Sequence, residues 1–230
     1  MRTTLRYSLW PAWVLVAATI LAALPAHARD WSVKVVDKDP PAAIADSIKA
    51  ELQHKAVQVS DSGKLAFEFW LVKDLPLKSK PASPDKALDN IAEITLLGAA
   101  VVHQDERDFR DDDIFADTYT MRFGLQPQDG DHLGTSIYPY FALLTMAKLD
   151  KSAKGFSKFK DLEDASETDT PSEHPVVMSL RPPSKKDGTA PEIRQPDTDK
   201  TSVYITVPAT ADGEKMTLPF EIVVEGHGVL

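Results

Sequence analysis

The sequence has no cysteine among its 230 residues. This absence excludes a disulfide framework, a thiol nucleophile, and zinc or iron–sulfur sites that use cysteine ligands. Basic residues are also in short supply, with 26 Lys and Arg against 35 Asp and Glu and a formal net charge of −9. Nucleic acids and anionic membrane surfaces are recognised through basic patches, so the sequence argues against both as partners.

Several enzyme motifs are missing as well. The sequence has no HExxH, no phosphate-binding GxxxxGK or GxGxxG, and no GxSxG, since Ser136 lies in Gly134-Thr-Ser-Ile-Tyr138. A carboxylate pair of the glycosidase type stays open, because only geometry identifies such a pair among many acidic residues. On balance we expect a protein that is not an enzyme.

Long apolar runs are absent except at the N-terminus. There, two arginines precede an apolar stretch over 10–24, which ends in Pro25 and the small-x-small sequence Ala26-His-Ala28. These features are typical of a signal peptide, and the run is shorter than the ~20 residues of a transmembrane helix. We therefore expect residues 1–28 to be removed, leaving a soluble, acidic protein in the periplasm or outside the cell, with no membrane span.

The rest of the chain alternates between short β patterns and turn residues. Alternating or β-branched residues predict strands over 31–36, 56–60, 65–72, 96–102, 118–125, 138–146, 175–180, 202–207 and 216–225. Turns are expected at 61–63 and 211–213, and Gly98 is expected at a bulge or a close backbone approach. Ile44, Ile48 and Leu52 recur every four residues, which predicts an amphipathic helix over about 41–54. A short surface helix is expected over 157–167.

No strand–helix–strand alternation recurs, which argues against a parallel, doubly wound sheet. Two antiparallel sheets packed face to face would bury the alternating apolar faces. We expect a mainly β fold, an antiparallel β-sandwich with one N-terminal helix and short helical decorations. It would form a single domain over 29–230 with long polar loops at 148–172 and 181–200, the second of them mobile. Two domains divided near 150–175 are the alternative.

The stretch from Tyr119 to His132, YTMRFGLQPQDGDH, has a recognisable pattern. It is similar to a strand YTLRYGLQP followed by a GDHxG turn, and in this the chain resembles a group of uncharacterised exported bacterial proteins. The resemblance extends over most of the mature chain, at 67–71, 96–98, 108–110, 141–144, 174–175 and 226–227. It implies secretion and a β-rich fold, but no reaction. The chain departs from the group at Asp117, where the group has a glycine before the strand, so the tight turn of the group is unsupported there.

The turn Asp129-Gly-Asp-His-Leu-Gly134 carries candidate ligands. Its glycines permit positive φ, and Asp129, Asp131 and His132 carry oxygen and imidazole donors for a divalent metal. The turn is too short for an EF-hand. We favour the simpler interpretation, a β-turn in which aspartate caps backbone amides and the histidine lies on the surface.

Three histidines, His132, His174 and His227, lie near glycine or proline at predicted strand ends. If these ends converge on one rim, the three imidazoles would form a site for zinc or copper. The alternative, which we favour, is that each histidine ends a strand and hydrogen-bonds a neighbouring loop.

Other polar and aromatic residues allow two interpretations each. The acidic run 105–113 suits calcium or a solvated loop, in which Arg110 would pin a carboxylate. Arg122, opposite an aromatic strand face, suits a carboxylate or sulfate ligand, or a cross-strand ion pair on a solvated face. Trp70, Tyr138 and Tyr140 suit a carbohydrate-stacking platform or ordinary packing. In each case the second interpretation is the commoner one.

We hypothesise that the exported protein binds a small molecule, a carbohydrate or an envelope protein through loops 103–117, 126–137 and 171–175 at one rim. The candidate ligand-binding residues are Arg110, Arg122, Asp129, Asp131 and His132. One alternative is a metal-binding protein or metal-dependent enzyme that uses His132, His174 and His227. The other is a structural component of the cell envelope.

Overall fold

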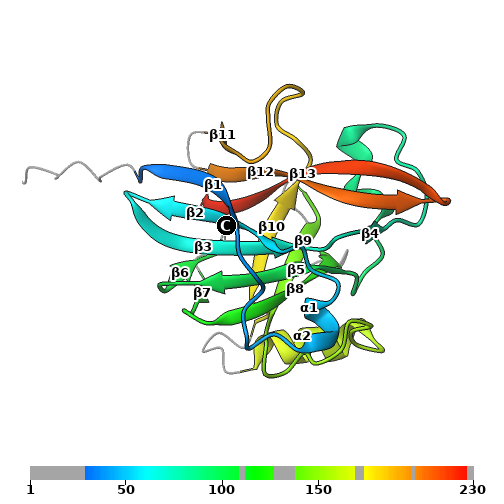
Figure 1. Ribbon diagram of the computed structural model, residues 1–230, viewed down its shortest axis with the longest axis horizontal. Helices are drawn as coiled ribbons and strands as arrows, with labels where there is room; N and C mark the ends of the chain where they lie inside the picture. The colour runs from blue at the N-terminus through cyan, green and yellow to red at the C-terminus, as the bar shows by residue number, and fades with distance from the viewer. Residues whose placement is uncertain (1–28, 109–111, 127–137, 169–173, 198–199, 227–230) are drawn as a thin grey trace, which may run out of the picture.

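The computed structural model describes residues 29–108, 112–126, 138–168, 174–197 and 200–226 (Figure 1). Within these residues the strands are β1 (Trp31–Asp37), β2 (Lys55–Asp61), β3 (Lys64–Leu71), β4 (Leu75–Pro76), β5 (Leu96–Val102), β6 (Glu106–Arg107), β7 (Asp113–Ile114), β8 (Thr118–Leu125), β9 (Tyr140–Met146), β10 (Val177–Arg181), β11 (Glu192–Asp197), β12 (Lys200–Ala211) and β13 (Glu214–Gly226). The helices are α1 (Asp46–Lys49) and α2 (Phe159–Glu167), with short 3₁₀ turns η1 (Pro84–Lys86) and η2 (Leu88–Asn90). No helix in the described part of the chain is long and apolar enough to cross a membrane.

One curled sheet dominates the fold. Its hydrogen-bonded order is β1-β2-β3-β5-β8-β9-β10-β13-β12-β11, with β4 added beside β12, while β6 and β7 form a separate pair. Neighbours in this order are antiparallel, and only β4 joins its neighbour in parallel. The expected mainly β class is therefore confirmed. The expected pair of separate antiparallel sheets is not found, because the facing layers are two halves of one continuous, mixed sheet.

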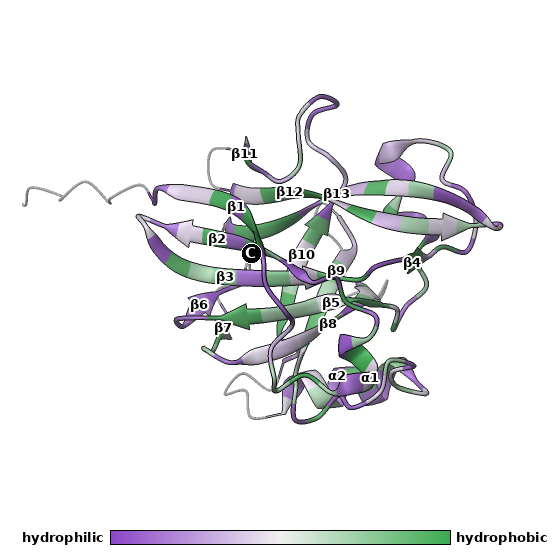
Figure 2. Cartoon of the chain, viewed as in Figure 1, coloured by the Kyte–Doolittle hydropathy of each residue, from purple (hydrophilic) through white to green (hydrophobic). Residues whose placement is uncertain are grey.

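Strand register sorts the side chains into an inner and an outer face. On the inner face, Val59 pairs with Phe67, and Phe67 pairs with Val102. The Phe67 ring stacks on the rings of Trp31 and Phe69, with centroids 6.3 and 5.8 Å apart. Figure 2 shows the corresponding alternation of apolar and polar residues along the strands. Burying this apolar row is the main driving force for curling the sheet, because it removes one whole face from water.

Two tight turns confirm the expected hairpins. Ser62 and Gly63 have φ of 50° and 79°, and Asp212 and Gly213 have φ of 51° and 80°. Positive φ at both central residues matches the right-handed twist of the flanking strands. Gly98 also lies where expected, at a register shift in β5, where a Cβ atom would lie 2.3 Å from the backbone oxygen of Trp70.

The helix predicted over 41–54 is wrong in length, since α1 is a single turn. By Leu52 the chain is extended, bridging to Val72, and the Gln53 amide donates to the Leu71 carbonyl. Ile44, Ile48 and Leu52 are all buried. The spacing of these three residues therefore reflects their burial against the sheet and does not indicate a continuous helix.

The expected polar loops contain regular structure. The short helix expected over 157–167 is confirmed as α2, and its Leu162 packs on Phe141 and Val177 of the outer face. The segment 181–200 was expected to be a mobile loop, but it contains the edge strand β11. Its Arg194 is only 3% exposed, because a buried carboxylate neutralises it.

Candidate functional site

The structure describes only some of the predicted site residues. Arg110, Asp129, Asp131, His132 and His227 lie outside the described residues. His174 is described and exposed, ahead of β10. Among the residues that the structure describes, no group of three or more His, Asp or Glu side chains is arranged to hold a metal ion.

Arg122 lies on the outer sheet face, and the expectation that this face is solvated is wrong there. Its side chain is fully buried. Nε donates to Asp150 Oδ2 at 2.6 Å and Nη2 donates to Oδ1 at 3.1 Å. The guanidinium also donates to the carbonyls of Ile94 and Ser152 at 3.0 and 2.7 Å. These bonds fix the segment after β9 against the sheet, so Arg122 has a structural role.

Packing prevents the three aromatic side chains Trp70, Tyr138 and Tyr140 from forming the expected exposed platform. Trp70 is fully buried, and its indole donates to the Lys38 carbonyl at 3.0 Å. Tyr140 donates a short hydrogen bond to Asp89, and burial together with this carboxylate raises the Tyr140 pKa. The centroid of the Tyr138 ring lies 5.3 Å from the Arg181 guanidinium.

The acidic run is partly folded and paired. Glu106 in β6 is 5% exposed and accepts two bonds from Arg29 at 3.0 and 2.9 Å. Arg29 also donates to Asp61 at 2.8 Å. Burial raises the pKa of Asp61, but its bonds to Arg29 and Ser62 outweigh burial and lower it overall. The first described residue is thus anchored to β2 and β6.

Two further carboxylates are buried on the outer face with partners of their own. Glu221 accepts bonds from the Ser184 amide and hydroxyl, from Arg194 and from the Ser202 hydroxyl, at 2.6 to 3.0 Å. The Arg194 guanidinium in turn lies 3.6 Å from the centroid of the Tyr204 ring. This cluster ties the segment before β11 to the sheet.

Glu68 forms the other cluster. It accepts bonds from Lys38 at 2.7 Å, Gln58 at 2.8 Å and His103 at 2.9 Å. Burial raises the Glu68 pKa, but these three bonds outweigh it and lower the pKa overall. Both outer-face carboxylates have their acceptor capacity filled by the protein itself, so neither is open to a ligand.

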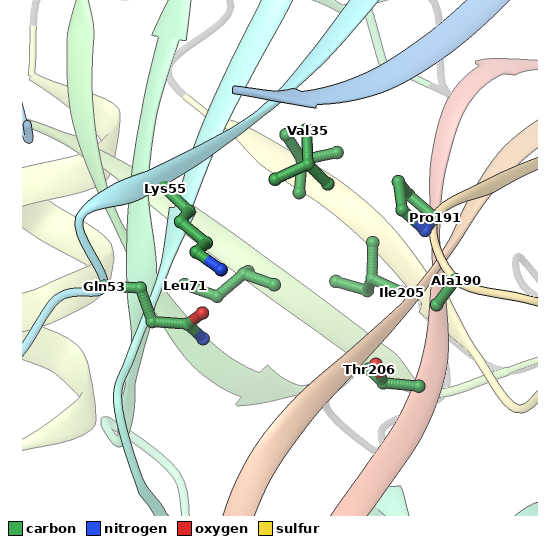
Figure 3. A pocket seen from close by; sticks show the side chains of 9 residues that line it. Val35, Gln53, Lys55, Leu71, Ala190, Pro191, Ile205 and Thr206 are labelled. Carbon is green, nitrogen blue, oxygen red and sulfur yellow. The ribbon is translucent and has the colours of Figure 1, made fainter. Parts of the chain in front are cut away.

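A cavity of about 210 Å³ lies between the two ends of the sheet (Figure 3). One wall comes from β1, β2 and β3, and the other from β12 and the segment that precedes β11. The apolar lining is Val35, Val57, Leu71, Ala190, Pro191 and Ile205, and the polar lining is Gln53, Lys55 and Thr206. We call this space the seam cavity, because the strands that flank it end the sheet.

Strand register explains the apolar wall. Val35 lies opposite Val57, and both belong to the inner row that continues through Phe69. Val35 is nevertheless 46% exposed, and the only other exposed large apolar side chain in the described part of the chain is Leu149 at 37%. At the seam, β1 has a strand partner on one side only. The inner-face side chains of β1 therefore border open space at the seam, whereas those of other strands pack in the core.

Lys55 gives the seam cavity a charged edge. Lys55, Val57 and Val59 alternate on one face of β2, so the lysine occupies the inner row (Figure 3). The side chain of Lys55 is exposed and has no ion pair or hydrogen bond with any described residue. Gln53 beside it is held in place, since its side-chain amide donates to the Val72 carbonyl at 3.0 Å.

The seam cavity opens into a wider depression of about 680 Å³, with which it shares Gln53 and Lys55. Its other lining residues are Asp37, Lys38, Asp39, His54 and Lys73. His54 Nδ1 lies 2.6 Å from Asp39 Oδ1, and Lys73 donates to the Ala50 carbonyl at 2.8 Å. A hollow that combines apolar side chains with a cationic edge suits an amphipathic small molecule.

Comparisons with protein-family models, with curated proteins and with solved structures found no match for this chain. The candidate site therefore rests on its own geometry.

The sequence patterns pointed to loops, whereas the walls of the seam cavity come mostly from strands. One sequence signal was available. In the pattern Lys55-Ala-Val-Gln-Val59, the alternation that places Val57 and Val59 inside also places Lys55 inside. A lysine in an otherwise apolar inner row is unusual in a packed core.

Proposed function

We propose that this chain is an exported, soluble binding protein without catalytic activity, and that its ligand is a small molecule held in the seam cavity. The N-terminal sequence and the resemblance to exported β-rich proteins support export to the periplasm or beyond. The observation that carries the proposed function is a cavity with both apolar and polar lining, in which the inner-row Val35 is exposed. A concave site lined by apolar side chains and a few polar groups is the usual form of a small-molecule binding site.

The size of the seam cavity limits its occupant. A dry cavity of ~150 Å³ is large enough to take up benzene. At about 210 Å³, the seam cavity accepts one small ring or one short branched chain, while the remainder of a ligand would lie in the outer depression.

The lining also argues for binding over catalysis. The walls of the seam cavity hold one amine, one hydroxyl and one amide, while the carboxylates of Asp37 and Asp39 and the imidazole of His54 line only the outer depression. A general acid–base mechanism needs a group that exchanges protons near neutral pH within reach of the substrate.

The proposal is tested with neutral probes, benzyl alcohol and isoamyl alcohol, by thermal unfolding of the processed protein. A ligand that binds the native state raises the midpoint in proportion to its occupancy. We expect both probes to raise the midpoint for the unmodified protein. Val35→Phe should abolish the shift by filling the entrance, whereas Leu149→Phe, at the other exposed apolar residue, should leave it unchanged. No shift in the unmodified protein, or an equal shift in Val35→Phe, would overturn the proposal.

A further inference from the structure

We infer that the ligand of the seam cavity is a small carboxylate with an apolar ring or branched tail, and that Lys55 pairs with its anionic group. This inference rests on the proposed function and adds the chemical class of the ligand. Three features carry it: the placement of Lys55, the state of the charges around it, and the apolar wall behind it.

Lys55 is the charged residue that lines both the seam cavity and the outer depression. Its ammonium group therefore stands where the seam cavity and the outer depression adjoin. A carboxylate at this boundary would contact Lys55 while its tail lies against Val57 and Leu71. The geometry fits a molecule whose charge and apolar group are separated by only a few bonds.

The neighbouring charges favour an anion over a cation. Asp39 is engaged by His54 at 2.6 Å, and the Lys38 ammonium is bound to Glu68 at 2.7 Å. Lys55 has no carboxylate partner in the described part of the chain, and Lys73 bonds only to a backbone carbonyl there. The mouth thus presents two ammonium groups without a carboxylate partner in the described part of the chain, Lys55 and Lys73, beside the carboxylates of Asp37 and Asp39.

Asp37 is the opposing charge. It lies directly opposite Lys55 in the β1–β2 register and lines the outer depression, but it is not part of the seam cavity. No ion pair joins the two among the described residues. An anion seated in the seam cavity would therefore contact Lys55, whereas Asp37 lines only the outer depression. A cation in the seam cavity would meet the Lys55 ammonium and no carboxylate of the described lining, which makes an amine the least favoured ligand.

The test compares benzoate, benzyl alcohol and benzylamine, which share one ring and differ in charge. Calorimetric or thermal-shift titration of the processed protein at low salt should give benzoate an affinity about three- to fivefold above that of the alcohol, as expected for a solvent-exposed ion pair. Benzylamine should bind more weakly than the alcohol. Salt on the order of 1 M should remove the preference for benzoate, because it screens exposed charges.

Variants locate the preference. Lys55→Gln should bind benzoate and benzyl alcohol equally, whereas Lys55→Arg should keep the preference because the positive charge remains. Lys34→Gln is the matched control, since Lys34 is exposed on β1 and pairs in register with the outer-face residue Gln58. This control should behave as the unmodified protein does.

The outcomes separate the inference from the proposed function. If benzyl alcohol binds without any preference for benzoate, or if the preference survives Lys55→Gln, the assignment of a carboxylate ligand is wrong and the cavity remains a binding site. Preferential binding of benzylamine would also overturn it and point to Asp37. If none of the three compounds binds, the proposed function fails and the inference fails with it.

Discussion

The outer face of the sheet and the seam cavity use charge in opposite ways. On the outer face, Arg122, Glu221 and Glu68 are buried, and each is surrounded by partners that this chain supplies. At the seam, Lys55 is exposed and has no such partner in the described part of the chain, beside a valine that the core does not cover. A buried charge whose partners all come from the chain has a structural role, whereas a charge without such partners can pair with another molecule. Four predictions test this contrast.

The largest effect is expected at Glu221. Replacing it with glutamine removes the buried carboxylate that pairs with Arg194 and leaves the partly exposed Glu192 as the remaining carboxylate contact of that guanidinium. Breaking a buried pair costs ~3–5 kcal/mol of unfolding free energy. Urea denaturation of Glu221→Gln against the unmodified protein measures the loss. Glu214→Gln serves as control, because Glu214 pairs with Lys80 on the exposed surface and its removal should leave stability unchanged. Equal stability of both variants would contradict a structural role for the Glu221 cluster.

Arg122 should show a smaller but still large effect. Arg122→Met leaves Asp150, at 2% exposure, without its cation, for a loss of ~3 kcal/mol. Combining it with Asp150→Leu should recover much of this loss, since an apolar pair needs no neutralisation. Binding of benzyl alcohol at the seam should be the same in the single and double variants. A loss of binding that the second substitution does not restore would show that Arg122 contributes to the ligand site.

Glu68 should make stability depend on pH. Its pKa is lowered in the folded protein, so the stabilisation is complete above the ordinary carboxyl value of about 4 and is lost as the pH falls through the lower folded value. Denaturant unfolding between about pH 3 and pH 6 should show a smaller loss of stability on acidification for Glu68→Gln than for the unmodified protein. Glu51→Gln, at an exposed residue, should follow the unmodified protein. Parallel curves for all three proteins would refute the expected contribution.

The smallest effect on stability is expected at the seam. Val35→Ser should change the unfolding free energy by about 0.5 kcal/mol or less, because the side chain is already half exposed. The same variant should weaken binding of benzyl alcohol, which a titration would show. A large loss of stability would mean that Val35 belongs to the core, and the contrast between the two regions would fail.

Sequence patterns predicted the strands better than the architecture. Alternation over 65–72 and 118–125 identified β3 and β8, because one face of each strand is buried and side chains alternate between faces. The same alternation cannot tell two stacked sheets from one sheet that curls upon itself. The helix over 41–54 was overextended, because spacing by four also suits an irregular segment packed on a sheet.

The polar residues were the harder part to predict. Arg122 and Arg194 read as surface residues until their partners, Asp150 and Glu221, are seen 28 and 27 residues away in sequence. No local pattern encodes such pairs. The seam cavity was missed for a related reason: it depends on which strands end the sheet, and the hydrogen-bonded order alone decides that.

The anchoring of Arg29 has a consequence for the order in which the leader is removed and the N-terminal end docks. If the leader is removed after Ala28, as its sequence predicts, the first residue of the processed chain is Arg29, which is hydrogen-bonded to Asp61 and Glu106. A processing enzyme needs a stretch of slack polypeptide on both sides of the bond that it cuts. Once Arg29 is docked, that slack is gone on the downstream side. The leader would therefore have to be removed before Arg29 docks.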